Sequence, residues 1–97
     1  MQRNFDDKFL RMLRNDIPIQ TLITDILDMP SKYSEGYFRF LCPRCFEFNT
    51  SVKKSTNLAR CFRCKENFNP IDLVMNINNI SFKETVEFLK QYLQKIS

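Results

Sequence analysis

The chain has 97 residues, of which 43% are hydrophobic and 27% are charged, with four cysteines and no histidine. This length supports one domain with a modest core, and no apolar run approaches the roughly 20 residues that a membrane-spanning helix needs. The amino-terminal stretch lacks the apolar segment and cleavage site of a secretory signal. We therefore expect a cytoplasmic protein with reduced thiols and no membrane partner.

The net charge of +4 is unevenly distributed along the chain. Residues 1–31 and 66–97 each carry a net charge of −1, whereas residues 32–65 hold eight basic and two acidic groups, a net charge of +6. Eight of the thirteen aromatic side chains lie between residues 33 and 68. This middle segment therefore has a positive excess that suits a polyanion.

The first predicted element is a short helix that begins near residue 4. Asn4 is its expected N-cap, and Asp6 and Asp7 place negative charge in the first turn, where the helix dipole favours it. Apolar side chains then recur at helical spacing at Phe5, Phe9, Met12 and Leu13.

A second helix is predicted to end by residue 29. Asp16 is its expected cap, and Pro18 lies in the first turn, where its missing N–H does no harm. Pro30 is expected to stop it, so residues 4–29 are predicted to be helical. The apolar stripe of this helix consists of Ile19, Leu22, Ile23, Ile26 and Leu27.

From residue 37 the hydrophobic period changes from helical to two, which predicts β-strands. Phe38 and Phe40 face one way and are assigned to the core, while Tyr37 and Arg39 face the other way. We expect one small antiparallel sheet within residues 37–68. Its strands are predicted at residues 37–41, 50–54 and 58–62.

Helical signals return after the last cysteine and predict two helices over residues 70–95. Asn69 is the expected cap of the first, with Pro70 at its first position and Asp72 in its first turn. The segment from Ser81 to Glu84 has the Ser-x-x-Glu pattern of a capping box. The predicted fold class is therefore α+β, a small antiparallel sheet flanked by amino-terminal and carboxy-terminal helices.

Cys42, Cys45, Cys61 and Cys64 form two C-x2-C pairs separated by fifteen residues. Each pair places two thiolates on one tight turn, and the segment between the pairs can form a hairpin that leaves and returns. Four sulfurs can then surround one ion tetrahedrally at roughly 2.3 Å. Because no coordination position stays open, the pattern predicts one structural zinc ion, whose binding stabilises the sheet by on the order of 10 kcal/mol.

Three other uses of the cysteines compete with zinc. Two disulfides conflict with a reducing cytosol. A redox dithiol needs only one C-x2-C in a thioredoxin-like βαβ setting, which the sequence lacks. An iron–sulfur centre of the rubredoxin kind also uses two such pairs and is kept as an alternative to zinc.

Basic and aromatic side chains share the middle of the chain, a combination typical of proteins that bind single-stranded nucleic acid. Arg44 and Arg63 occupy equivalent positions in the knuckles CPRC and CFRC. Either they lie against the thiolates or they point toward phosphates, and the sequence leaves both alternatives open. The candidate nucleic-acid-binding residues are Tyr37, Arg39, Arg44, Lys53, Lys54, Arg60, Arg63 and Lys65.

These motifs resemble the amino-terminal zinc-binding domain of bacterial and phage-type DNA primases, over nearly the whole chain. The family's opening helix resembles DIPIQTLITDIL, its two zinc knuckles resemble FLCPRC and ARCFRC, and its closing helices resemble NPIDLVMNINNISFKETVEFLKQYL. The C-F-x-C knuckle, followed by the Ile-Asp-Leu-Val-Met run and the Ser-Phe-x-Glu segment, is more specific than a generic zinc ribbon.

The chain departs from the pattern of this family at both knuckles. Cys45 stands where the family usually has a histidine, and a thiolate suits zinc equally well. The Pro-Ser-Phe segment after the first knuckle is missing. Lys65 and the residues after it replace the usual glycines, which leaves the turn of the second knuckle open because glycine tolerates positive φ far better than lysine.

The resemblance implies a single zinc-ribbon domain, residues 1–97, that helps to engage single-stranded DNA in primer initiation beside a separate catalytic domain. The sequence lacks an acidic constellation for nucleotidyl transfer, so we do not expect an enzyme. Expected partners are single-stranded DNA and a replication protein such as a helicase or polymerase.

The natural-looking start and the helical finish favour a free-standing small protein of a phage, plasmid or other mobile element over a fragment of a longer primase. An alternative function uses the same scaffold differently. The chain would then be a protein-interaction adaptor that binds a helicase, polymerase or regulator.

Overall fold

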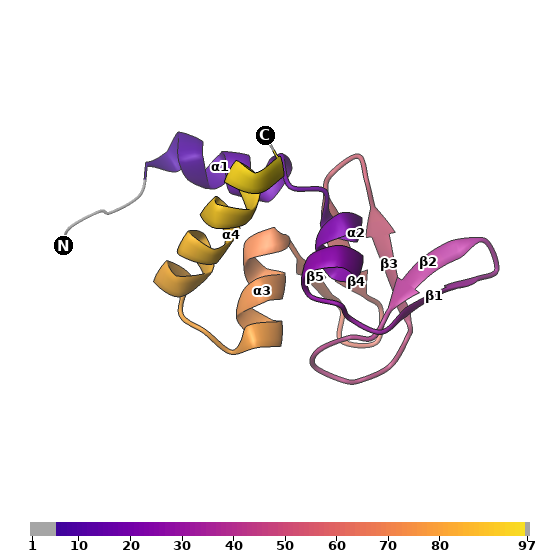
Figure 1. Ribbon diagram of the computed structural model, residues 1–97. Helices are drawn as coiled ribbons and strands as arrows, with labels where there is room; N and C mark the ends of the chain where they lie inside the picture. The colour runs from indigo at the N-terminus through magenta and orange to yellow at the C-terminus, as the bar shows by residue number, and fades with distance from the viewer. Residues whose placement is uncertain (1–5, 97) are drawn as a thin grey trace.

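The computed structural model describes residues 6–96, with the side chain of residue 96 excepted, and has the predicted α+β class (Figure 1). Helices α1, α3 and α4 lie together at one end, the strands lie at the other, and α2 lies beside the strands. In chain order the elements are α1 (Asp7–Asn15), α2 (Ile19–Thr21), the π-helical turn η1 (Leu22–Ile26), β1 (Ser31–Ser34), β2 (Tyr37–Phe40), β3 (Thr50–Lys53), β4 (Leu58–Cys61), β5 (Glu66–Phe68), α3 (Pro70–Asn78) and α4 (Phe82–Ile96).

The amino-terminal part contains two helical segments, but their boundaries differ from the prediction. Asp6 caps α1, because its carboxylate accepts hydrogen bonds from the N–H groups of Lys8 at 2.7 Å and Phe9 at 3.2 Å. The predicted cap, Asn4, lies outside the described residues. Asp16 closes α1 as its C-cap instead of opening the second helix.

The second helical segment starts after Pro18, its N-cap, and runs through α2 into η1. In η1 the hydrogen bonding widens to the π type, and the N–H of Leu27 donates to the C=O of Leu22 at 2.9 Å. The segment ends at Ile26, before the predicted residue 29. Asp28 follows with a φ of 49°, in the left-handed region that a right-handed helix cannot use.

The strands form two small antiparallel sheets instead of the one predicted sheet. β1 pairs with β2, so that Ser31 lies opposite Phe40. β3, β4 and β5 form the second sheet, in which Thr50 lies opposite Cys61. β1 and β5 are absent from the predicted strands because both are short and mostly polar, and the strand at residues 37–41 therefore pairs with a segment that the hydrophobic pattern did not reveal.

A two-residue turn joins β1 to β2 in a hairpin that protrudes from the rest of the molecule (Figure 1). Glu35 and Gly36 have φ angles of 55° and 81°. Both values are positive, as a type I′ hairpin turn requires. Gly36 is the only glycine in the chain, and it adopts this backbone without the strain that a Cβ atom causes.

The two sheets are joined by side chains between β2 and β3. The hydroxyl of Thr50 accepts a hydrogen bond from the N–H of Phe40 at 2.8 Å and donates one to its C=O at 2.6 Å. The guanidinium of Arg39 donates to the C=O of Thr50 at 2.8 Å. Thr50 is fully buried, so these three hydrogen bonds replace a backbone ladder at this junction.

Capping boxes open both carboxy-terminal helices; the one at Ser81 and the N-cap at Asn69 were predicted, whereas the reciprocal bond that completes a box at Asn69 was not. Asn69 and Asp72 exchange backbone-to-side-chain hydrogen bonds of 2.8 and 3.2 Å at the start of α3. Ser81 and Glu84 do the same before α4, at 3.0 and 3.1 Å. The hydrogen bonds from Ser81 stabilise the ionised form of Glu84 and lower the pKa of its carboxyl group.

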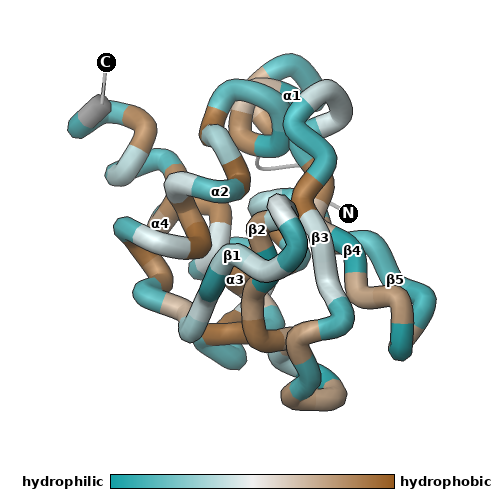
Figure 2. The backbone as a smooth tube through the Cα atoms, turned by 90° about the vertical axis from the view of Figure 1, so that its right-hand side faces the viewer, coloured by the Kyte–Doolittle hydropathy of each residue, from teal (hydrophilic) through white to brown (hydrophobic). Residues whose placement is uncertain are grey.

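One hydrophobic core connects the helices to the strands, and hydrophobic and hydrophilic segments alternate along the trace in Figure 2. The predicted core position Phe40 is fully buried, and Phe38 is half-buried against the core. Other fully buried members are Leu13, Ile17, Leu22, Ile23, Leu73, Val74, Val86 and Leu89. None of the helices within residues 6–96 is long and apolar enough to cross a lipid bilayer.

Candidate metal centre and nucleic-acid interface

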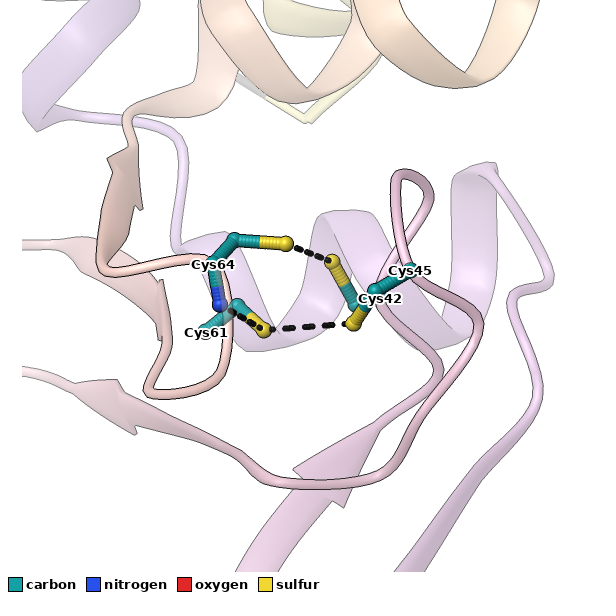
Figure 3. A group of neighbouring side chains, drawn as sticks. All are labelled: Cys42, Cys45, Cys61 and Cys64. Carbon is teal, nitrogen blue, oxygen red and sulfur yellow. Dashed lines mark hydrogen bonds between the residues drawn. The ribbon is translucent and has the colours of Figure 1, made fainter.

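The four cysteines converge from two turns between strands (Figure 3). Cys42 and Cys45 follow β2, and their turn is closed by a 3.0 Å hydrogen bond from the N–H of Phe46 to the C=O of Cys42. Cys61 is the last residue of β4, and Cys64 lies in the turn before β5. The segment between the pairs contains the β3–β4 hairpin, so the chain leaves and returns as the cysteine spacing predicts.

The sulfur geometry fits one tetrahedral metal ion. Sγ of Cys42 lies 3.8 Å from Sγ of Cys64, and Sγ of Cys45 lies 3.6 Å from Sγ of Cys61. All four sulfurs lie within 4.8 Å of one another. Zinc–sulfur bonds of about 2.3 Å in a tetrahedron require sulfurs roughly 3.8 Å apart, so these four cysteines fit one zinc ion.

Backbone amides support the sulfurs in both knuckles. The N–H of Arg44 donates to Sγ of Cys42 at 3.4 Å, and the N–H of Cys64 donates to Sγ of Cys61 at 3.3 Å. These donors place partial positive charge against the first thiolate of each pair. The same local turn therefore holds the ligand and stabilises its negative charge.

The pKa values of the thiols differ across the cluster. Burial raises the pKa of Cys42, and burial together with hydrogen bonds to the other thiols raises the pKa of Cys64 to about 12. Burial also acts to raise the pKa of Cys61, but hydrogen bonds from the Cys64 N–H and the other thiols outweigh it and lower this pKa. Zinc must displace protons from these thiols, so its affinity rises with pH.

The set of ligands indicates a structural ion. Cys42 and Cys61 are buried, Cys45 and Cys64 are half-buried, and four sulfurs complete a tetrahedral shell. A catalytic zinc keeps one coordination position for water or substrate. Four protein ligands leave no such position open. The zinc therefore holds the two knuckles together.

The arginines of the two knuckles have different surroundings. Arg44 donates a 2.6 Å hydrogen bond to the carboxylate of Glu66 in β5, which is neither of the two alternatives left open by the sequence. This half-exposed ion pair connects the first knuckle to the strand after the second. Arg63 and Lys65 are exposed on the second knuckle. Lys65 has a φ of 58°, in the left-handed region that glycine adopts most easily.

Several predicted nucleic-acid-binding residues lie on the sides of the two sheets that face away from the core, which we call the outer face. Strand alternation and register give it Lys32, Ser34, Tyr37, Arg39, Ser51, Lys53, Leu58, Arg60 and Asn67, with Phe62 directly after β4. The Arg60 guanidinium lies 5.6 Å from the centre of the Phe62 ring and donates to Asn67 at 3.1 Å. Arg39 lies 5.6 Å from the Tyr37 ring, although its bond to Thr50 leaves its side chain only 20% exposed.

Lys54 lies apart from the outer face. It lines a groove of about 660 Å³ between the β3–β4 turn and the start of α2. Asn57, in the same turn, donates to the C=O groups of Arg14 at 2.7 Å and Ile17 at 2.8 Å and accepts from the N–H of Ile19 at 2.9 Å. Asn57 therefore fastens the amino-terminal helices to the ribbon.

Two residues of the outer face are absent from the residues predicted from the sequence. Lys32 lies over the ring of Phe48, with Nζ 4.7 Å from the ring centre, and Phe62 is exposed beside Arg60. The position of Lys32 opposite Arg39 depends on β1, which the sequence pattern did not predict. Alternation from Arg60 does indicate that Phe62 lies on the same side of β4.

The fold and the four-cysteine centre define a zinc ribbon flanked by helices. The sequence matches the CHC2 zinc finger family of primase zinc ribbons over residues 5–96. The chain therefore belongs to this family. It is also 30% identical over 91 residues to a DNA primase of Streptomyces coelicolor, an alignment that covers 92% of this chain but 14% of that protein.

Proposed function

We propose that this chain, as one domain of residues 1–97, is a zinc-stabilised module that binds single-stranded DNA in replication or primer initiation. Membership of the CHC2 zinc finger family and similarity to a DNA primase support the role in replication. In this proposal the four cysteines are the zinc ligands, and the metal holds the strands that carry the DNA-binding side chains.

The observation that carries the proposal is the outer face, which brings together cations and exposed aromatic rings. Lys53 and Arg60 lie on neighbouring strands and can contact successive phosphates. Phe62 is 46% exposed and Tyr37 is 61% exposed, so their rings are available to stack on unpaired bases. Arg63 and Lys65 extend the positive charge onto the second knuckle.

The chain spans 14% of the length of the primase that it resembles, so we propose that catalysis belongs to another domain or protein. In this proposal the chain positions DNA for that catalytic partner and is not itself an enzyme. A replication protein such as a helicase or polymerase fits this role. Four thiolates suit the reducing cytoplasm as the site of action.

The test measures binding of the zinc-loaded chain to a fluorescent oligothymidine by anisotropy at several salt concentrations. We expect Lys53→Ala with Arg60→Ala to weaken binding and to reduce the slope of log affinity against log salt by about 0.7 for each lost contact. The matched control is Lys83→Ala with Lys90→Ala, which removes the same charge from the exposed surface of α4. This control is expected to retain the wild-type salt slope.

Two results would contradict the proposal. The first is that the zinc-loaded wild-type chain does not bind the oligonucleotide at low ionic strength. The second is that both double variants lose affinity equally, which would indicate a response to net charge alone. Retained activity with a replication partner in the Lys53 and Arg60 variant would instead favour the adaptor function.

A further inference from the structure

Phe46 has a backbone conformation that its side chain does not favour. It follows Cys45 at the tip of the first knuckle and has a φ of 59°, in the left-handed region. Among the described residues, the other non-glycine positions with positive φ are Asp28, Glu35, Asn57, Lys65 and Asn79. Asparagine and aspartate enter this region most readily, whereas a bulky aromatic residue is a clear outlier there.

Burial does not explain why this position carries an aromatic side chain. Phe46 is 68% exposed, and it is not among the half-buried residues that pack against the core. Asn57, by contrast, uses its positive φ to make three hydrogen bonds to the amino-terminal segment. Lys65 has the same conformation at the equivalent position of the second knuckle, so the knuckle turn explains the positive φ but not the exposed aromatic ring that Phe46 carries there.

The loop that contains Phe46 lies beside the outer face. Within this loop, the C=O of Asn49 accepts a 2.9 Å hydrogen bond from the N–H of Phe62, and the Phe48 ring lies under the ammonium group of Lys32. Phe62 and Lys32 both belong to the outer face defined above. The loop that carries Phe46 therefore adjoins the zinc end of the outer face.

The charges near Phe46 suit a base better than a phosphate. Glu47 is its exposed neighbour, and a zinc ion with four thiolates carries a net charge of about −2. Both repel a phosphate group. The π-face of a nucleobase is uncharged, and an aromatic ring accepts it by stacking whatever the base sequence.

We propose that Phe46 is a stacking site for an unpaired nucleobase and that it extends the outer face across the first zinc knuckle. This inference rests on the proposed function, because it assumes that single-stranded DNA binds the outer face. The proposal gives a binding role to Phe46, which the distribution of charge alone does not identify as a binding residue. The zinc centre then serves to hold this ring at a fixed position.

The experiment compares Phe46→Gly, Phe46→Leu and Phe46→Trp in the full zinc-loaded chain, with oligothymidine containing one 2-aminopurine as the probe. Loss of the ring in the Gly and Leu variants should weaken binding about 5- to 100-fold and remove the quenching of 2-aminopurine by stacking. The Trp variant keeps a ring and should retain both. Glycine adopts positive φ freely, so Phe46→Gly should melt at the wild-type Tm or above it.

Tyr33→Ala is the matched control, because Tyr33 is 70% exposed but lies on the opposite side of β1 from Lys32. It is expected to leave affinity and quenching unchanged. Wild-type affinity in Phe46→Gly, in an assay where the Lys53 and Arg60 variant binds weakly, would overturn the stacking role and leave the proposed function intact. If the wild-type chain does not bind at all, both proposals fail together.

Discussion

Cys45 is the residue at which this chain departs from the Cys-His-Cys-Cys ligand pattern of its family. Its sulfur lies 3.6 Å from that of Cys61 and is half-buried, so the position has room at the edge of the cluster. Zinc binds imidazole nitrogen at about 2.0–2.1 Å and thiolate sulfur at about 2.3 Å. Either ligand therefore completes the tetrahedron from this position.

We predict that Cys45→His still binds one zinc ion per chain. Cys45→Ser should lose about a quarter of the zinc-binding free energy, which is on the order of 10 kcal/mol. Metal analysis after gel filtration and competition with a chromophoric chelator measure both variants. Equal zinc loss in the His and Ser variants would show that the cluster cannot accommodate an imidazole ring.

The convergence of the four cysteines could be predicted from the sequence, because metal coordination dictates their chemical type and their spacing. Asn57 could not be predicted in the same way. Its three partners lie about forty positions earlier in the chain, and an asparagine in a turn has an adequate local explanation without them. Arg44 is similar, because its partner Glu66 becomes its neighbour only once β5 is in place.

Among the helices and strands, those determined by local sequence were predicted better than those that depend on long-range pairing. The starts of the helices over residues 70–95 were predicted well because their N-terminal caps, at Asn69 and Ser81, are encoded within four residues. The single predicted sheet was wrong, since β1 and β5 lack hydrophobic alternation and are stabilised by pairing with their neighbours. The junction between β2 and β3 depends on one buried threonine, for which no sequence pattern exists.

Thr50→Val tests this junction, since the two side chains have nearly the same shape. The substitution removes both hydrogen bonds to Phe40 and leaves its buried N–H and C=O without partners. We expect a loss of about 2 kcal/mol and a Tm lower by about 10 °C in thermal unfolding followed by circular dichroism.

Thr85→Val is a matched control for Thr50→Val. Thr85 is also fully buried, but its hydroxyl has no hydrogen-bond partner among the described residues. Its replacement should be neutral or stabilising, because a buried hydroxyl without a partner is itself unfavourable. If both variants lose the same stability, the hydroxyl of Thr50 does not join the two sheets.

At the scale of the whole molecule, one metal ion organises a chain with a modest core. Zinc binding contributes on the order of 10 kcal/mol, which is comparable to the entire stability of an ordinary domain. The core reaches the centre itself, because Cys42 and Cys61 belong to the buried hydrophobic cluster. Metal binding and folding are therefore expected to be one process.

We predict that a strong chelator unfolds the strands and abolishes DNA binding, and that stoichiometric zinc restores both. Circular dichroism and oligonucleotide anisotropy follow the two effects. Zinc-free thiols hold protons that the metal displaces, and the raised pKa values of Cys42 and Cys64 place them in the protonated state at neutral pH. Affinity for zinc should therefore fall as the pH falls, and a pH-independent affinity would contradict this account.

The three hydrogen bonds of Asn57 couple zinc binding to the position of the amino-terminal helices. They connect the hairpin between the two cysteine pairs to residues 14–19, from the last turn of α1 to the start of α2. We expect loss of the ion to loosen the hairpin and to break these three hydrogen bonds. A spectroscopic reporter placed on α1, remote from any sulfur, should therefore register occupancy of the centre.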